Sequence, residues 1–172
     1  MTKIGLISID AEVVQALDRG PDFFEARYHA RVGEVANLAL EVAKQTMTML
    51  ESGPREIIWG GYLAADEDTA SVIGCCGFKA APTPEGTVEV AYFTFPGFEG
   101  CGYATAMANR LVQLALSSPS VRRIRAHTLP ERNASARILE KIGMLFVGEV
   151  IDPDDGNVWR WERESSELRQ RA

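Results

Sequence analysis

The stretch TFPGFEGCGYATAMANRLVQLAL, residues 94–116, decides how the rest of the chain is arranged. It joins the end of a β-like run to a long amphipathic run through a loop that contains Gly100 and Gly102. Pro96 has no N–H group to donate to a neighbouring strand, so strand pairing ends there. Apolar residues after the loop recur at helical spacing, which predicts a helix over residues 103–116.

The glycine loop between these two elements is suited to bind an anion. Gly100 and Gly102 can adopt positive φ angles, and they let a ligand approach the main chain closely. The N–H groups of residues 100–105 would then point into the loop, where the positive end of the helix dipole adds to them. The alternative is a plain connector. The loop is neither a Walker loop nor the full dinucleotide fingerprint.

The remaining elements follow from periodicity and from turn residues. Before the loop, the sequence predicts strands over 3–9, 56–65, 70–80 and 87–95, helices over 11–19 and 31–50, and a turn anchored by Phe23 and Phe24. After the loop, it predicts a strand over 121–128, a helix over 133–142 and a terminal hairpin. The strand–helix–strand crossover requires one parallel pair within an otherwise antiparallel sheet. We expect an α/β (α+β) fold with one domain over 1–164 and a charged tail over 165–172.

Composition and charge exclude several classes of protein. The chain of 172 residues is 46% hydrophobic, which is enough for a sizeable core. Its net charge of −6 argues against binding to nucleic acid or to acidic membranes. Three cysteines, two of them adjacent, do not form a disulfide framework, and no apolar run is long enough to span a membrane. We therefore expect a cytoplasmic protein, and no Cys/His spacing predicts a metal site.

Two motifs resemble the GNAT (N-acetyltransferase) superfamily, in particular the branch with the ribosomal-protein N-terminal acetyltransferases. They are VEVAYFTFPGFEGCGYATAMANRL, residues 88–111, and HTLPERNASARILEKIGM, residues 127–144. The resemblance covers about residues 56–162. It implies the GNAT fold, a mixed, mostly antiparallel twisted sheet flanked by helices, with a V-shaped splay between its parallel strands. It also implies acetyl-CoA as co-substrate and no metal.

The first motif matches the family's Q/R-x-x-G-x-G/A loop at Gly102 and Ala104, whereas Glu99 departs from the usual glutamine or arginine. An acid beside a pyrophosphate is unfavourable unless its carboxylate points to solvent. By resemblance, the pyrophosphate would be held by the loop and the first helical turn, namely Gly100, Cys101, Gly102, Tyr103, Ala104 and Thr105.

The second motif, NASARILEKIG, resembles the family's N-x-x-S-x-x-x-L-E-K-x-G-F. Asn133 stands two residues before Ser135 instead of three, and Met144 replaces the usual aromatic residue. The resemblance implies that Asn133 and Ser135 flank the pantetheine arm, although either could be only a helix N-cap. It further implies that pantetheine bonds to the main chain of the preceding strand. The matching residues there, which could also be sheet core, are Phe93, Thr94 and Phe95.

Acetyl transfer to an amine needs an oriented thioester, a base for the amine proton and an acid for the leaving thiolate. We expect Glu89 to be the base. Burial within an apolar strand disfavours its charge and raises its basicity, and related sequences often have Glu at this position. The alternative for Glu89 is an exposed acid or one paired with an arginine. His127 competes with it, because histidine titrates near neutral pH, or it is a packed structural residue.

For the acid, Ser135 is the first candidate, acting directly or through water, followed by Tyr92 and Tyr103. Cys101 lies between the glycines, but direct transfer needs no thiol nucleophile.

These residues predict an acetyl-CoA-dependent N-acetyltransferase that acts on a primary amine by direct transfer. The acceptor would be a protein N-terminus or a small-molecule amine, and the negative net charge favours a cationic one. Two alternatives stay open: a non-catalytic acyl-CoA-binding sensor on the same fold, and an interaction module whose terminal hairpin forms a homodimer.

Overall fold

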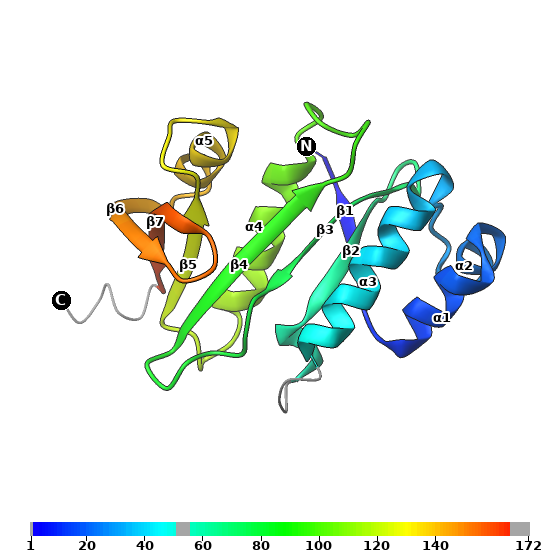
Figure 1. Cartoon of the computed structure of the whole chain (residues 1–172), viewed down its shortest axis with the longest axis horizontal. Helices are drawn as coiled ribbons and strands as arrows, with labels where there is room; N and C mark the ends of the chain where they lie inside the picture. Colours follow the sequence, from blue (N-terminus) through cyan, green and yellow to red (C-terminus); the bar gives the residue numbers. More distant parts are fainter. Residues whose placement is uncertain (1, 51–55, 166–172) are drawn as a thin grey trace.

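The computed structural model describes residues 2–50 and 56–165. Its centre is a seven-stranded sheet with helices on both faces (Figure 1). Across the sheet the strands follow the order β1-β2-β3-β4-β5-β7-β6. The strands are β1 (Ile4–Ser8), β2 (Gly61–Asp66), β3 (Val72–Phe78), β4 (Thr87–Thr94), β5 (Arg123–Thr128), β6 (Leu145–Asp152) and β7 (Gly156–Glu164). The helices are α1 (Ala11–Arg19), α2 (Pro21–Tyr28), α3 (Ala36–Leu50), α4 (Tyr103–Leu116) and α5 (Ala134–Lys141), with short 3₁₀ turns at Gly33–Val35 and Ile57–Trp59.

The helices are divided between the two faces because side chains alternate along each strand. In β2, Tyr62 and Ala64 pack into the core that contains residues of α4 and α5. Leu63 and Ala65 point the other way, into the core formed with α1, α2 and α3. No helix within the described ranges has the length and apolar character that a membrane crossing requires.

The parallel pair β4/β5 holds the two halves of the sheet together only at one end. The register pairs Thr87 with Arg123, Val88 with Ile124 and Glu89 with Arg125. Beyond Glu89, β4 continues to Thr94 without a partner strand on that side, so the two strands open into a V (Figure 1). All other neighbouring strands of the described sheet are antiparallel. The mixed, mostly antiparallel sheet with a parallel splay is therefore confirmed, and α4 begins and ends where the helix over 103–116 was predicted.

One predicted turn is wrong. Phe23 and Phe24 lie in the helix α2, which begins at Pro21 directly after α1 ends. Proline is favoured in the first helical turn, so the Gly20-Pro21 pair both stops one helix and starts the next. Only Phe24 of α2 is buried, which is why the segment has no helical periodicity to detect. The charged tail over 165–172 lies outside the described residues, except for Ser165.

Candidate active site

The glycine loop lies between the end of β4 and the start of α4, at the open end of the splay (Figure 1). Gly97, Gly100 and Gly102 have φ angles of +91°, +76° and +83°, so the predicted left-handed conformations are present. The first helical hydrogen bond runs from Ala106 N–H to Gly102 C=O. Among the described residues, no acceptor takes the N–H groups of residues 100–105. The loop therefore presents several free donors at the positive end of α4.

Glu99, the departure from the family's loop motif, is exposed and turned away from these donors. Its Oε2 accepts a hydrogen bond of 2.8 Å from Gly97 N–H. Cys101 is also exposed, and its thiol lies 3.6 Å from Glu99 C=O. The carboxylate thus closes the first turn of the loop and leaves the N–H groups of residues 100–105 uncovered.

Tyr103 anchors the start of α4 to the β2–β3 turn. Its hydroxyl donates a 2.9 Å hydrogen bond to Asp66 Oδ2, and Asp66 Oδ1 accepts from the N–H groups of Asp68 and Thr69 at 3.0 Å and 2.7 Å. The N–H of Thr69 and the Tyr103 hydroxyl together lower the pKa of Asp66 against the opposing effect of burial. Burial and the Asp66 charge raise the pKa of Tyr103 to about 12. As an acid candidate, Tyr103 is therefore already committed to a structural contact.

The edge of β4 that faces the splay has main-chain groups available for a ligand. Lys79 N–H bonds to Glu89 C=O, and Phe95 N–H bonds to Ile73 C=O. Because hydrogen bonding alternates along an antiparallel strand, Glu89, Ala91, Phe93 and Phe95 direct their main chain to β3. The intervening Tyr92 and Thr94 direct theirs into the splay.

The structure places the three predicted pantetheine contacts differently. Phe95 is fully buried, with its N–H bonded to Ile73 and its C=O bonded to Phe98, so it presents no free group. Phe93 is half exposed on the face covered by α3. Thr94 has a buried hydroxyl without a partner among the described residues. An orphaned buried hydroxyl beside an open strand edge is the kind of group that a bound molecule satisfies.

Glu89 stands where β4 and β5 separate, and its side chain is 20% exposed. Its Oε1 lies 2.7 Å from Lys79 Nζ and 2.9 Å from His127 Nδ1. Within the described part of the chain, Oε2 has no hydrogen-bond partner. The acid predicted within an apolar strand is thus a paired one, with lysine and histidine as its partners in place of the arginine considered above, and with both contacts on Oε1.

His127 has both ring nitrogens engaged. Arg160 Nε donates to His127 Nε2 at 3.1 Å, so Nε2 must carry a lone pair. Nδ1 then carries the proton and donates it to Glu89. His127, predicted as a rival base or a packed residue, orients Glu89 in this structure.

Sequence reasoning missed Lys79 and Arg160. Lys79 follows the last residue of β3 and lies opposite Glu89 across the hairpin, and Arg160 lies opposite His127 across the β5–β7 pair. Once the register is known, the opposite charges of Lys79 and Glu89 at paired positions could have found Lys79, and the donor and acceptor paired at Arg160 and His127 could have found Arg160. Burial opposes the charge of Lys79, yet the hydrogen bond that it donates to Glu89, together with the charges of Glu89, Asp155 and Asp152, raises its pKa above the ordinary value.

The second motif forms the start of α5. Asn133 is the N-cap, and its Oδ1 accepts a 3.0 Å hydrogen bond from Ala136 N–H. Ser135 is partly exposed in the first turn, and its hydroxyl has no hydrogen bond to another described residue. Tyr92 is largely buried, which raises its pKa to about 12.

Two cavities next to these elements bear on the site. One of about 210 Å³ lies between α3, β3 and β4, next to Lys79, and includes Tyr92 and Phe93. Another of about 530 Å³ lies beside the glycine loop, along α4. Gly102 and Thr105 line it, and its charged residues are the basic Lys3, Arg110 and Lys141 and the acidic Glu67.

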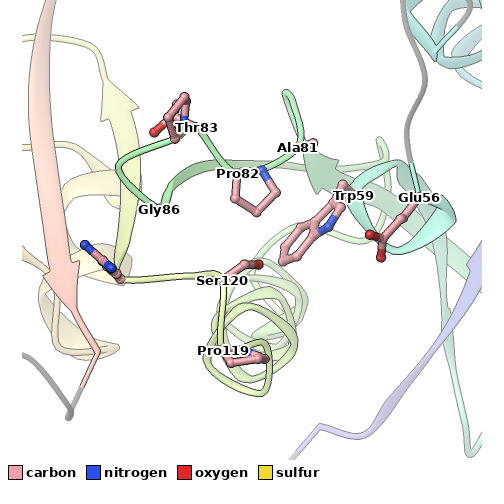
Figure 2. A pocket seen from close by; sticks show the side chains of 10 residues that line it. Glu56, Trp59, Ala81, Pro82, Thr83, Gly86, Pro119 and Ser120 are labelled. Atoms are coloured by element: carbon pink, nitrogen blue, oxygen red, sulfur yellow. The ribbon is translucent and has the colours of Figure 1, made fainter.

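A third cavity, of about 730 Å³, lies at the opposite end of α4. Figure 2 shows Trp59 and Pro82 on one side of it and Ser120 and Pro119, just after α4, on the other. The 14 residues of α4 separate it by about 20 Å from the glycine loop, so it is distinct from the site built around Glu89.

Comparison with known proteins finds acetyltransferases. The family model described as "Acetyltransferase (GNAT) domain" matches residues 8–145. The uncharacterized N-acetyltransferase YjdG of Bacillus subtilis (strain 168) is 29% identical over 85 residues, which are 49% of this chain and 51% of that protein. The chain thus spans about half the length of the curated relatives it matches.

Solved structures with the same fold include two acetyltransferases with named acceptors. RimL, a ribosomal L7/L12 α-N-protein acetyltransferase in complex with coenzyme A, has a TM-score of 0.66 at 14% identity, covering 96% of both chains. A chimera of the spermidine N-acetyltransferase SpeG from Vibrio cholerae has a TM-score of 0.66 at 14% identity, covering 98% of this chain and 99% of that one. At this identity the likeness concerns the fold.

Proposed function

The chain belongs to the GNAT acetyltransferase family, and from this premise we propose that it is an acetyl-CoA-dependent N-acetyltransferase that acts on a primary amine by direct transfer. Acetyl-CoA would supply the acetyl group: a bond forms between the amine nitrogen and the acetyl carbon, the carbon–sulfur bond breaks, and CoA leaves as the thiol. The observation that carries the proposal is a free anion-binding loop beside a half-paired strand with a carboxylate at the splay.

The loop supports the binding of the pyrophosphate. The free N–H groups of residues 100–105, with the dipole of α4 behind them, are donors for its oxygens. The adjacent cavity of about 530 Å³ gives room for the nucleotide, and its Lys3, Arg110 and Lys141 complement phosphate charge. Glu99 does not oppose this binding, because its carboxylate is directed to Gly97.

The edge of β4 supports the binding of the pantetheine arm. Tyr92 and Thr94 offer main-chain donors and acceptors in the splay, and the Thr94 hydroxyl lacks a partner among the described residues. Asn133 and Ser135 begin α5, which follows β5, the opposite wall of the splay. An amide-containing chain that lies in the V would satisfy these groups.

Glu89 is the proposed base. Its Oε2 takes the proton from the acceptor amine, while His127 and Arg160 fix the orientation of the carboxylate through Oε1. Ser135 is the proposed donor of the proton to the leaving sulfur, directly or through water. The amine acceptor and a cytoplasmic location are parts of the same proposal, and a homodimer through the β6–β7 hairpin stays a prediction.

The test is a free-thiol release assay with acetyl-CoA and a panel of amines that includes N-terminal peptides. Glu89→Gln keeps the shape of the side chain but accepts no proton, so kcat is expected to fall by about 100-fold or more. Binding of CoA, measured by calorimetry, is expected to stay within about twofold of the unchanged chain, because the loop is intact. Glu85→Gln, in the exposed β3–β4 turn, is the matched control and keeps full activity.

Two results would count against the proposal in different ways. If the unchanged protein binds CoA but acetylates no amine in the panel, it is a sensor and not an enzyme. If CoA does not bind at all, the glycine loop has a purely structural role.

A further inference from the structure

The cavity between α3 and the β3–β4 pair is apolar. Its described walls contain no carboxylate, and Lys79 is their single charged residue. At about 210 Å³ it has room for ~7 groups the size of a water molecule. The lining residues are Ile9, Val42, Thr46, Met49, Leu50, Gly61, Cys75, Cys76, Gly77, Phe78, Lys79, Ala91, Tyr92 and Phe93.

This cavity lies next to Glu89. Ala91 and Phe93 line it from β4, and Glu89 lies on the same face of that strand because side chains two residues apart share a face. One step along the strand, about 7 Å, therefore separates the cavity wall at Ala91 from the carboxylate. Whatever fills the cavity and carries an amine at its end would present that amine to Glu89.

Lys79 already places an amine at Glu89 from the border of the cavity. Its side chain is a primary alkylamine that borders the cavity, and its Nζ lies 2.7 Å from Glu89 Oε1. With 41% of the side chain exposed, and Asp155 Oδ2 at 3.9 Å as an alternative partner, it can leave Glu89 without losing all its counter-charge. The Lys79 side chain thus binds this carboxylate in the way that an acceptor alkylammonium would bind it.

We propose that the acceptor is a small primary monoamine with an apolar carbon body, which displaces Lys79 from Glu89 and occupies the apolar cavity. The inference rests on the proposed function and narrows it to one class of substrate. A second ammonium on the carbon body would be placed among apolar walls whose described residues include no anion, and an unpaired buried charge is strongly disfavoured. Polyamines are therefore poor substrates, in spite of the negative net charge of the chain.

The test compares two amines with the same six-carbon chain, 1-hexylamine and 1,6-diaminohexane, by kcat/KM in the thiol-release assay. We expect 1-hexylamine to be preferred by about 100-fold, the usual cost of leaving one buried charge unpaired. Equal or better use of the diamine would overturn the inference and would point to the Asp152–Asp155 turn as the site of the second ammonium. Exclusive use of N-terminal peptides would overturn it as well.

A cavity-filling variant tests whether the apolar cavity is the cause of the preference for hexylamine. Ala91→Leu adds three carbon atoms at an exposed position of the wall, so the ratio of kcat/KM for hexylamine over ethylamine should fall by about 10-fold. Ala80→Leu, an exposed alanine that does not line the cavity, keeps the ratio of the unchanged protein. An unchanged ratio in Ala91→Leu would place the acceptor elsewhere.

Lys79→Met removes the tethered competitor and keeps the length of the side chain. We expect KM for hexylamine to fall by about 10-fold, because the acceptor no longer competes with a linked amine. A rise in KM would mean that Lys79 helps to bind the acceptor, which contradicts the displacement. Loss of turnover in Lys79→Met alone would likewise contradict the displacement, whereas absence of turnover in the unchanged protein, while CoA still binds, would refute the proposed function.

Discussion

Asp66 is a buried carboxylate that joins two parts of the molecule. Its two oxygens accept from the β2–β3 turn and from Tyr103 at the start of α4. Replacing it changes no group of the proposed chemistry, yet it loosens the base of the glycine loop. A substitution of Asp66 therefore tests the stability of the loop without removing a proposed catalytic group.

The contribution of Asp66 depends on pH in a defined direction. Its folded-state pKa lies below the ordinary value of about 3.9, so the unfolded chain binds the proton more readily. The stabilisation is complete above that value and is lost as the pH falls through the folded pKa. Asp66→Asn should lower the free energy of unfolding by about 1 kcal/mol at pH 7, and the difference should shrink below about pH 4. Urea unfolding at several pH values measures both.

Asp68→Asn is the control, because Asp68 is exposed and contributes its N–H rather than its carboxylate to the turn. A difference between Asp66→Asn and the unchanged chain that stays constant down to pH 3 would contradict this account.

At this scale the sequence singled out the carboxylate that lies at the splay but not its surroundings. Glu89 stood out as an acid between valines. Its partners are Lys79, directly after β3, and His127 in β5, and only the strand registers bring them to the same oxygen. Spacing along the chain does not give the strand registers, so these two partners of Glu89 could not be predicted.

Strand β4 has two kinds of backbone amide within a few residues. Phe93 and Phe95 direct theirs to β3, whereas Tyr92 and Thr94 direct theirs into the splay. If pantetheine pairs with this edge, only the second kind gains protection from solvent exchange. Hydrogen exchange followed by NMR should show Tyr92 and Thr94 slowed by about 10-fold or more when CoA is added.

Phe93 and Phe95 are the internal controls, since they are expected to be protected with and without CoA. Equal slowing of all four amides would mean that CoA stabilises the whole sheet and does not pair with β4.

Elements with strong local signals were predicted well, and those without them were not. The loop and α4 match because proline, glycine and helical periodicity coincide over residues 96–116. Helix α2 was missed because it packs on α1 with one buried residue, and no apolar stripe marks it. The strand expected from residue 56 begins at Gly61, after a 3₁₀ turn that places Trp59 in the core.

The architecture of the whole molecule followed from one topological requirement. A strand, a helix and another strand in sequence demand a parallel pair, and family resemblance placed its splay correctly. The apolar cavity beside Glu89 could not be predicted in this way. Its walls come from α3, β3 and β4, and its shape depends on how these elements pack.

The short parallel pairing between β4 and β5, which has three paired positions, also divides the chain into two continuous segments. The elements from β1 to α4 lie on one side, and β5, α5, β6 and β7 lie on the other, joined by the short exposed linker around Pro119. Two fragments, 1–118 and 119–172, should thus complement each other when mixed, because α4 and β5 contribute to one shared core. The pantetheine arm of CoA, bound in the V, would touch both fragments at once. CoA should therefore tighten their association by about 10-fold in analytical ultracentrifugation, so that the ligand holds the two sides of the splay together.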